Sequence, residues 1–593
     1  MEERFELESP LVHLCIETAT QSADAVETWR RQRRTLERLP SQLAGALLHR
    51  LLNRHLLYPS LLEVFKYSVE KLDLRGESSV DAEWMAYIGA FHYLCSLNVS
   101  YCHRINSSAL WALSGMNYLK EVDISRCSKV NDAGLKHLLS VQTIEKLWIS
   151  ETSVTSDGVT LLSSLKRLSL LDLGGLFVSD MALASLQVLT NLQHLDLWGS
   201  DISDEGSSYF VKFPNLNFLN LAWTKVTMLP NVSSITYLNM SNCTIHSILK
   251  GEGNKARLSN LILAGALFKD VTKVFLYFDS TCLTFLDLSN CSIRDLSFLP
   301  CMHDLEYLDL SGNIIGDDTV TFIASVGSKL KTLNLNNTRV SSTGVALLTG
   351  HVPKLEIISL DYTLIDDVAI SYIGMIPSLQ VVNIKGTNVR GLIKRNDTDE
   401  EFVPSLTALE NLKDLKKLDL EETQLRDESI IPILSFKQLT HLSLRSSFLT
   451  DSSLQMMSSI PNLINLSFRD AVLTNAGIDT FSPPPLLEVL DLTGCWLLTK
   501  DAILSFIQHH PQIKILHELV STLLSDGENT KYASSFKTRM KTLQQRRFSS
   551  SPYKFETSTI IDQRLKYSRA ELLSLQFAST LVVPPTDLDM SPK

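Results

Sequence analysis

The sequence contains no run of about 20 consecutive apolar residues, the length that a membrane-spanning helix requires. Its first eight residues, Met-Glu-Glu-Arg-Phe-Glu-Leu-Glu, are acidic where a secretory signal would be basic and then apolar, so we expect no secretory signal. The nine cysteines are an odd number without a Cys-x-x-Cys pair, which disfavours a disulfide framework and a zinc site. These absences predict a cytoplasmic protein with reduced thiols.

Signatures of catalysis are missing as well. We find no P-loop, no glycine-rich dinucleotide turn, no His-Glu-x-x-His and no Gly-x-Ser-x-Gly. The 14 histidines are scattered, and the neighbouring pair His509 and His510 lies in a turn-like Gln-His-His-Pro stretch. The sequence therefore predicts a protein that is not an enzyme and has no metal or cofactor.

What the sequence does contain is one pattern repeated along most of its length. Residues 283–291 read Leu-Thr-Phe-Leu-Asp-Leu-Ser-Asn-Cys, and this Leu-x-x-Leu-x-Leu spacing is that of a leucine-rich repeat. Successive copies are mostly 24 or 25 residues apart, which is a solenoid period. The central apolar residues of the eighteen copies are Leu72, Leu97, Val122, Leu147, Leu171, Leu195, Leu219, Leu238, Leu261, Leu286, Leu308, Leu333, Ile358, Val382, Leu418, Leu442, Leu466 and Leu490.

The residue five places after the central one is small and able to form hydrogen bonds. It is a cysteine in five repeats and a threonine in six. We expect these side chains to tie each turn to the backbone of the neighbouring repeat, so that stacked repeats leave few buried polar groups unpaired. The residues are Cys102, Cys127, Cys243, Cys291, Cys495, Thr152, Thr224, Thr338, Thr363, Thr387 and Thr423.

This pattern predicts an α/β leucine-rich-repeat solenoid, a ribonuclease-inhibitor-like horseshoe of about 18 repeats over residues 69–524. Each repeat should place one short parallel strand on the inner face and a helix or turn on the outer face. A truncated repeat at residues 513–516 should close the array. The aspartates of the strands should form an acidic, partner-binding stripe on the inner face; they are Asp172, Asp196, Asp287, Asp309 and Asp419.

Residues 1–68 are predicted to form a helical cap over the first repeat, because apolar residues recur there at helical spacing. Two short segments also suggest docking. The segment with Leu11, Cys15 and Ala19 resembles the elongin-binding box of VHL-box ubiquitin-ligase receptors. The segment with Leu39, Pro40 and Leu43 resembles the cullin-binding box that follows it, and it has the Leu-Pro opening of an F-box.

One interval is about twelve residues too long, from Val382 to Leu418. The excess lies near residues 388–410 and is polar, so we expect a solvated loop, with a partner-binding role as the alternative.

The pattern ends near residue 524, and residues 525–593 are predicted to be a disordered basic tail because they lack a period and are rich in polar residues. The basic residues between Lys531 and Arg569 suit either a solvated linker or contact with RNA or an acidic protein. Ser550 lies in an Arg-x-x-Ser-x-Pro phosphorylation pattern.

Within the tail, residues 564–577 form an island with helical character. Ser568 and Glu571 form a capping box, and apolar residues follow at helical spacing. Tyr567, Leu572 and Leu573 then match the Tyr-x-x-x-x-Leu-Φ motif, in which Φ is apolar, by which scaffold and repressor proteins bind eukaryotic initiation factor 4E, the mRNA cap-binding protein. The flanking residues that resemble the scaffold's version are Arg564, Lys566, Arg569, Gln576 and Phe577.

A leucine-rich-repeat chain with this motif resembles plant regulators of translation. The resemblance implies a translation-initiation adaptor that binds the cap-binding factor through its tail and other initiation components through its repeats. The competing hypothesis is a substrate receptor of a cullin-type ubiquitin ligase, docking an elongin or Skp1-type adaptor through the amino-terminal segments.

Overall fold

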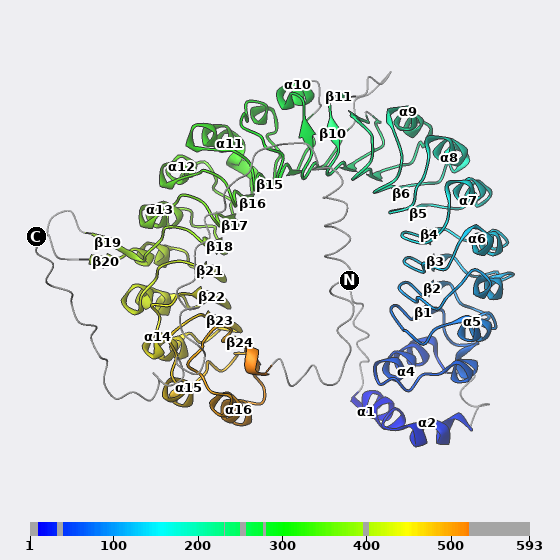
Figure 1. Ribbon diagram of the computed structural model, residues 1–593, viewed down its shortest axis with the longest axis horizontal. Helices are drawn as coiled ribbons and strands as arrows, with labels where there is room; N and C mark the ends of the chain where they lie inside the picture. The colour runs from blue at the N-terminus through cyan, green and yellow to red at the C-terminus, as the bar shows by residue number, and fades with distance from the viewer. Residues whose placement is uncertain are drawn as a thin grey trace, which may run out of the picture. The chain divides into compact units, whose positions relative to one another are not determined.

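The computed structural model describes residues 10–31, 39–230, 232–248, 257–276, 280–394 and 402–520. The chain divides into two compact units, Met1–Asn313 and Ile314–Lys593. In each unit short strands lie along one side of the ribbon and helices along the other (Figure 1).

The first unit begins with helices. They are α1 (Pro10–Ala19), α2 (Ala23–Arg30), α4 (Ser41–Asn53) and the 3-10 helix η1 (Pro59–Phe65). Helix α1 contacts both α2 and α4, and the carboxylate of Glu17 pairs with Arg50 of α4 and with Arg54, which directly follows that helix. The interior of this region comes from α4 and η1, through residues such as Leu47, Leu51 and Phe65.

The parallel strands of the first unit follow one another in chain order. They are β1 (Lys71–Asp73), β2 (Ser96–Asn98), β3 (Glu121–Asp123), β4 (Lys146–Trp148), β5 (Leu170–Asp172), β6 (His194–Asp196), β7 (Phe218–Asn220), β9 (Tyr237–Asn239), β12 (Asn260–Ile262), β14 (Phe285–Asp287) and β15 (Tyr307–Asp309). The connecting helices are α5 (Ala82–Ile88), η2 (Ala109–Leu113), α6 (Asp132–Leu138), α7 (Ser156–Leu161), η3 (Leu162–Ser164), α8 (Asp180–Ser185), η4 (Leu186–Val188), α9 (Asp204–Ser207), η5 (Ser208–Lys212), α10 (Val271–Leu276) and η6 (Leu299–Cys301).

The second unit repeats the arrangement. Its parallel strands are β16 (Thr332–Asn334), β17 (Ile357–Ser359), β18 (Val381–Asn383), β21 (Lys417–Glu421), β22 (His441–Arg445), β23 (Asn465–Arg469), β24 (Val489–Asp491) and β25 (Lys514–Leu516). Its helices are η7 (Asp317–Thr319), α11 (Val320–Val326), η8 (Gly327–Lys329), α12 (Ser342–Leu348), α13 (Asp367–Ile373), η9 (Ser405–Asn411), η10 (Asp427–Ser435), α14 (Asp451–Met456), η11 (Met457–Ser459), α15 (Asn475–Thr480) and α16 (Lys500–His509).

The predicted repeat solenoid is confirmed by its strands. Each of the eighteen central residues lies in a strand, and within each unit the central residues stand opposite one another in register, as Leu72 does with Leu97 and Leu442 with Leu466. These side chains are almost completely buried, while the residues on either side of them are partly exposed in most strands. The truncated repeat forms the strand β25, with Ile515 opposite Leu490.

The cysteines and threonines five places after the central residue are buried, except for the half-buried Thr152, but they bond in two different ways. The thiol of Cys127 lies 3.3 Å from the carbonyl oxygen of Val99 in the preceding repeat, as predicted. The hydroxyl of Thr363 instead donates to the carbonyl of Leu360 in its own repeat, at 2.6 Å. The prediction of a bond to the neighbouring repeat is therefore correct for the cysteines and wrong for the threonines, whose shorter hydroxyl group reaches only its own turn.

A second set of bonds joins the outer ends of successive repeats. The carboxylate of Asp451, in the first turn of α14, accepts from the backbone N–H of Thr474 at 2.8 Å and from its hydroxyl at 2.6 Å. Thr474 then caps the next helix, α15. Asp132, Asp180, Asp204, Asp317 and Asp427 bond in the same way to the repeat that follows each of them.

Two parts of the array are irregular. Around the short repeat at Leu238, the outer segments contain the short strands β8 (Met228–Leu229), β10 (Thr244–Ile245), β11 (Ser247–Ile248) and β13 (Leu267–Phe268). In the long interval, β19 (Leu392–Lys394) and β20 (Phe402–Pro404) pair antiparallel. The insertion is therefore a β-hairpin at its base and not simply a loop, because Leu392 and Ile393 pair with Pro404 and Val403.

Among the described residues, no helix is long and apolar enough to cross a membrane.

Candidate interaction surface

The strand alternation decides which side chains a partner could reach. In a strand, successive side chains point to opposite faces, so the residues before and after each buried central residue share the outward face. We call this outward side of the strands the strand face, and we describe it for each unit by itself.

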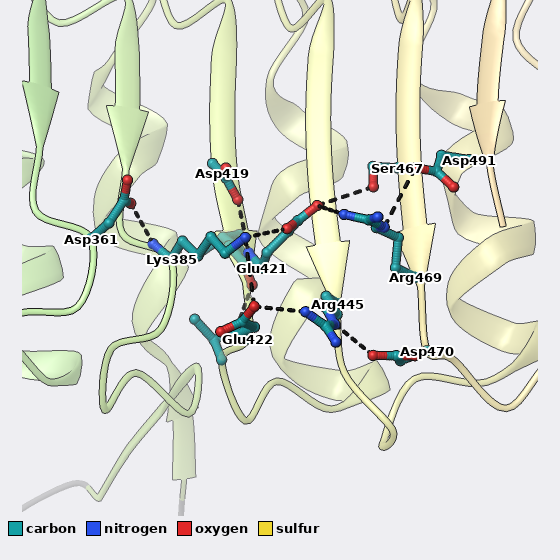
Figure 2. Close-up of polar contacts among 12 residues, drawn as sticks. Asp361, Lys385, Asp419, Glu421, Glu422, Arg445, Ser467, Arg469, Asp470 and Asp491 are labelled. Carbon is teal, nitrogen blue, oxygen red and sulfur yellow. Dashed lines mark hydrogen bonds and ion pairs between the residues drawn. The ribbon is translucent and has the colours of Figure 1, made fainter. Parts of the chain in front are cut away.

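The strand face of the second unit carries a set of ion pairs centred on Glu421 (Figure 2). The side chain of Glu421 is only 9% exposed. Its Oε2 lies 2.8 Å from Nζ of Lys385, and its Oε1 lies 3.4 Å from Nη1 of Arg469. The hydroxyl of Ser467 also donates to Oε1, at 3.3 Å. One carboxylate thus joins the repeats of β18, β21 and β23.

Further pairs extend this network on the same side. Arg445 bonds through Nη1 to Glu422 at 2.6 Å and through Nε to Asp470 at 2.5 Å. Arg469 also reaches Asp491 through Nε at 3.4 Å. We refer to these residues together as the ion-pair network; they are Lys385, Glu421, Glu422, Arg445, Arg469, Asp470 and Asp491.

The pKa shifts in the network follow from these contacts. Burial alone would raise the pKa of Glu421, but the hydrogen bond and charge of Lys385 and the charge of Arg469 outweigh burial and lower it. The hydrogen bond from Lys385 to Glu421 raises the pKa of the lysine. For nearby Asp419, burial followed by the charges of Glu421 and Asp361 outweighs the charge of Lys385 and raises the pKa to about 6. At neutral pH the carboxylate of Glu421 and the ammonium of Lys385 are therefore both charged.

The strand face of the first unit carries aromatic rings on β6, β7, β9, β14 and β15. The ring of His194 stacks on Phe218 with 3.7 Å between centroids, and Phe218 stacks on Tyr237 at 4.3 Å. Farther along, Phe285 stacks on Tyr307 at 4.0 Å. We call these five residues the aromatic row. All five are partly exposed, and burial lowers the pKa of His194 to about 4, so its ring is neutral at pH 7.

Four of the five aspartates predicted to form an acidic stripe lie beside this row, as two separate pairs, and they also have a structural task. Oδ1 of Asp172 accepts from the backbone N–H of Gly174 at 2.9 Å, and Asp196 and Asp287 accept from the residue two places later in the same way. Burial, followed by the charge of Asp196, raises the pKa of Asp172 to about 6 despite the hydrogen bond from Gly174. Asp309 is almost buried, and Asp419 belongs to the second unit.

The raised pKa of Asp172 leads to a pH-dependent prediction. A carboxyl whose pKa is about 6 in the folded chain and near 3.8 in the unfolded chain destabilises the folded state above pH 6, and this penalty disappears below about pH 4. Asparagine can accept the same bond, since Asn98 takes the N–H of Ser100 in the equivalent turn. We expect Asp172→Asn to raise the melting temperature at pH 7.5, with the gain shrinking as the pH falls.

Differential scanning fluorimetry across pH 4 to 8 measures this gain. Asp73→Asn is the matched control, because Asp73 accepts from Arg75 in the same kind of turn but is exposed. A lower melting temperature for Asp172→Asn at pH 7.5 would contradict the prediction.

The amino-terminal candidates are distributed over α1 and the start of α4. Leu11 is 68% exposed, and Cys15 is also exposed. Ala19, Leu39 and Leu43 are partly buried, and Pro40 is exposed at the start of α4. The outward position of Leu11 and Cys15 contradicts a cap that buries them against the first repeat, because α1 turns the side bearing Glu17 toward α4 instead.

The tail candidates lie outside the described residues. They are Tyr567, Leu572 and Leu573 with Arg564, Lys566, Arg569, Gln576 and Phe577, and Ser550 lies outside them too.

The described residues form a surface suited to binding, and we find few reactive groups among them. They contain no group of three or more His, Cys, Asp or Glu residues placed to hold a metal ion. Burial raises the pKa of the thiols of Cys102, Cys127, Cys291 and Cys495 to about 12, so these thiols are poor nucleophiles.

Sequence reasoning missed the ion-pair network and the aromatic row. A signal for both was present, because equivalent positions of successive repeats stand side by side. Reading the residue before each central residue from Leu195 to Leu308 gives His, Phe, Tyr, Asn, Phe and Tyr. Reading the third residue after it from Val382 to Leu466 gives Lys385, Glu421, Arg445 and Arg469.

Comparisons with known proteins agree on the repeats. Residues 283–324 match a family model described as leucine-rich repeats in two copies, and residues 188–211 match a second model described as a leucine-rich repeat. No curated protein matches the chain.

Similar solved structures include an internalin of Listeria monocytogenes, 19% identical, covering 72% of this chain and 94% of its own at a TM-score of 0.31. A leucine-rich-repeat protein of Leptospira interrogans is 15% identical and covers 77% of this chain and 98% of its own at a TM-score of 0.39. The Arabidopsis receptor kinase HAESA was solved with the peptide hormone IDA and the co-receptor SERK1. It is 17% identical, and the match covers 73% of this chain and 80% of its own at a TM-score of 0.37.

Proposed function

We propose that this leucine-rich-repeat chain is a cytoplasmic adaptor of translation initiation. We propose further that it has no enzymatic activity. In this proposal the tail binds the mRNA cap-binding initiation factor, and the strand faces bind other protein components. Repeat folds with extended strand faces mostly serve to bind proteins. Direct contact of the basic tail with RNA would be an additional activity.

The observation that carries the binding role is the ordered set of charged side chains on the strand face of the second unit. Glu421 is nearly buried and holds Lys385 and Arg469 from two other repeats. Charged groups fixed in this way are arranged before a partner arrives, so little side-chain entropy is lost on binding.

The assignment to translation depends on the sequence of the tail. Tyr567 would lie in an extended lead-in to a short helix, and Leu572 and Leu573 would enter a shallow apolar groove of the cap-binding factor. Burying each leucine contributes roughly 1.5–3 kcal/mol, against an ordering cost of about 2–5 kcal/mol for a segment that folds on binding. Arg564, Lys566 and Arg569 would add a salt-sensitive attraction to an acidic rim, and Gln576 and Phe577 would extend the contact.

Because the gain and the ordering cost are similar, losing two anchors should remove most of the net affinity. We expect Tyr567→Ala with Leu572→Ala to abolish retention on cap-analogue resin in the presence of the cap-binding factor. The melting temperature should not change, since neither residue belongs to the predicted repeats.

The matched control is Tyr553→Ala with Leu581→Ala, which removes the same residue types from the tail outside the motif. Retention of the Tyr567 and Leu572 double variant at the wild-type level would end the translation hypothesis.

A ligase receptor is the second candidate, and the exposed side chains of α1 favour it. Leu11 and Leu14 are 68% and 62% exposed, and Cys15 is exposed beside them. An elongin or Skp1-type adaptor could bind such an apolar side of a helix, with Leu39, Pro40 and Leu43 as the second box.

The same pull-down distinguishes this candidate from the first. If the ligase hypothesis is correct, Leu11→Glu with Cys15→Glu should remove elongin or Skp1-type proteins from the eluate and leave the melting temperature nearly unchanged. If neither adaptor is recovered with the wild-type chain, the ligase hypothesis is wrong.

A further inference from the structure

The aromatic row continues across adjacent strands of the first unit. Phe218 stands opposite His194 on one side and Tyr237 on the other, and Asn260 fills the position between Tyr237 and Phe285. Strands β6, β7, β9, β12, β14 and β15 contain no lysine or arginine. The row is therefore a strip of ring surface without positive charge in its own strands.

Carboxylates stand at both ends of this strip on the same face. Asp172 of β5 is opposite Asp196 of β6, and Asp287 of β14 is opposite Asp309 of β15. Between the two pairs, the equivalent position holds the neutral residues Asn220, Asn239 and Ile262. Negative charge is thus concentrated at two points that are separated by the rings.

The fold does not require these charges. Asn220 accepts from the backbone N–H of Ala222 at 3.1 Å, and Asn239 accepts from that of Ser241 at 2.9 Å, in the same turn position as the aspartates. A neutral amide therefore closes this turn as well as a carboxylate does. Burial raises the pKa of Asp172, Asp196 and Asp287, so these charged carboxylates raise the energy of the folded chain at neutral pH, and a positively charged ligand would relieve that penalty.

We propose that the aromatic row and its flanking carboxylate pairs bind an extended segment of a partner protein that carries two basic residues. Each basic side chain would lie at one carboxylate pair and against the nearest ring, where charge attraction and cation–π contact act together. The residues between them would lie across Phe218 and Tyr237. This inference deepens the proposed function, because it names the chemistry of the partner for the strand face of the first unit.

The strand spacing sets the distance between the two basic residues. Asp172 and Asp287 are five strand positions apart along β5, β6, β7, β9, β12 and β14. At about 4.8 Å per strand this is roughly 24 Å, which an extended chain at about 3.4 Å per residue covers in about seven residues. The segment should therefore present its basic residues about seven positions apart.

Nucleic acid is the other ligand that uses stacked rings, but the surroundings disfavour it. Proteins that bind single strands combine aromatic platforms with a positive groove that follows the phosphates. Here the rings are flanked by carboxylates, which would repel a phosphate backbone.

Fluorescence anisotropy with the full chain tests the proposal. The probe is a labelled ten-residue peptide of alternating valine and serine with arginine at positions 2 and 9, and the reference peptide has neutral citrulline at both positions. We expect the arginine peptide to bind about tenfold more tightly than the citrulline peptide. Asp172→Asn with Asp287→Asn should weaken binding of the arginine peptide by about the same factor, while its melting temperature should not fall.

Two further variants give matched comparisons. Asp73→Asn removes a carboxylate from the same turn position in β1, away from the rings, and should leave the affinity unchanged. Phe218→Leu with Tyr237→Leu keeps apolar side chains at both positions but removes two rings, and should weaken binding of both peptides.

The proposal is overturned if the two peptides bind equally or if Asp172→Asn with Asp287→Asn binds as tightly as wild type. Tighter binding of a labelled oligouridylate that depends on Phe218 would instead identify a nucleic-acid surface. The double variant Tyr567→Ala with Leu572→Ala should bind the arginine peptide as tightly as wild type. The peptide experiment therefore tests the aromatic row independently of the cap-binding hypothesis.

Discussion

Replacing Asn313 with alanine should destabilise the end of the first unit by about 3–5 kcal/mol, since each buried polar group left unpaired costs about 1–3 kcal/mol. Asn313 is 3% exposed and bonds to four backbone groups at 3.1 Å or less, with the carbonyl of Ser311 more distant at 3.4 Å. Its Nδ2 donates to the carbonyls of Leu288 at 2.8 Å and Leu310 at 2.9 Å. Its Oδ1 accepts from the N–H groups of Cys291 at 3.1 Å and Ile293 at 2.9 Å. Alanine would leave all four without this partner.

The neighbouring repeats suggest two partial rescues of the Asn313 variant. Asn313 stands five places after the central residue Leu308, the position that holds cysteine or threonine in other repeats. Cysteine there bonds to the preceding repeat and threonine bonds to its own repeat, whereas Asn313 does both. Asn313→Cys should therefore keep the bond to Leu288, and Asn313→Thr should keep the bond to Leu310. Each should be more stable than Asn313→Ala and less stable than wild type.

Hydrogen exchange of the amides in β14 and β15 measures the effect locally, because stability differs from one part of a structure to another. Urea denaturation followed by circular dichroism gives the overall change. The control is Asn215→Ala, which removes one exposed bond to the carbonyl of Thr190. Exchange in Asn313→Ala no faster than in this control would show that the four bonds contribute little.

The fold was predictable because the core imposes a period. Every repeat must bury its central residue against the next one, so the eighteen central residues were visible in the sequence and each lies in a strand. The sequence did not reveal which repeat the side chain five places after the central residue bonds to. Both cysteine and threonine fit the space, and only the reach of the side chain decides whether it bonds to its own or to the preceding repeat.

The candidate surfaces were harder to predict because they join residues that are distant in sequence. Lys385 and Glu421 are 36 residues apart, and the insertion between them forms the hairpin of β19 and β20, which the polar composition did not suggest. The exposure of Leu11 was likewise hidden, because the helical pattern alone does not say which side of α1 faces the rest of the chain. Pairing across repeats requires the register, which the structure supplies.

Replacing Glu421 with glutamine should lower the free energy of unfolding of the second unit by about 2–4 kcal/mol, because removing one partner of a buried ion pair leaves charge without compensation. Glutamine keeps the volume of the side chain and can still bond to Ser467, so the change tests the charge. The side chains of Lys385 and Arg469 are 24% and 34% exposed, which keeps the effect below that of a fully buried pair. Glu422, 3.6 Å from Lys385, also compensates part of the loss.

The dependence on pH identifies the charge of Glu421 as the cause. Its pKa is lowered in the folded chain, so its stabilisation is present above the pKa of an unfolded glutamate and is lost as the pH falls through the folded value. The difference between wild type and Glu421→Gln should therefore be full at pH 7 and shrink below about pH 4.5. Glu428→Gln, an exposed change in the same repeat, is the control. In urea denaturation at pH 7, equal midpoints for Glu421→Gln and Glu428→Gln would show that the ion-pair network does not stabilise the second unit. That result would also contradict the proposal that the ion-pair network fixes these charged side chains before a partner binds.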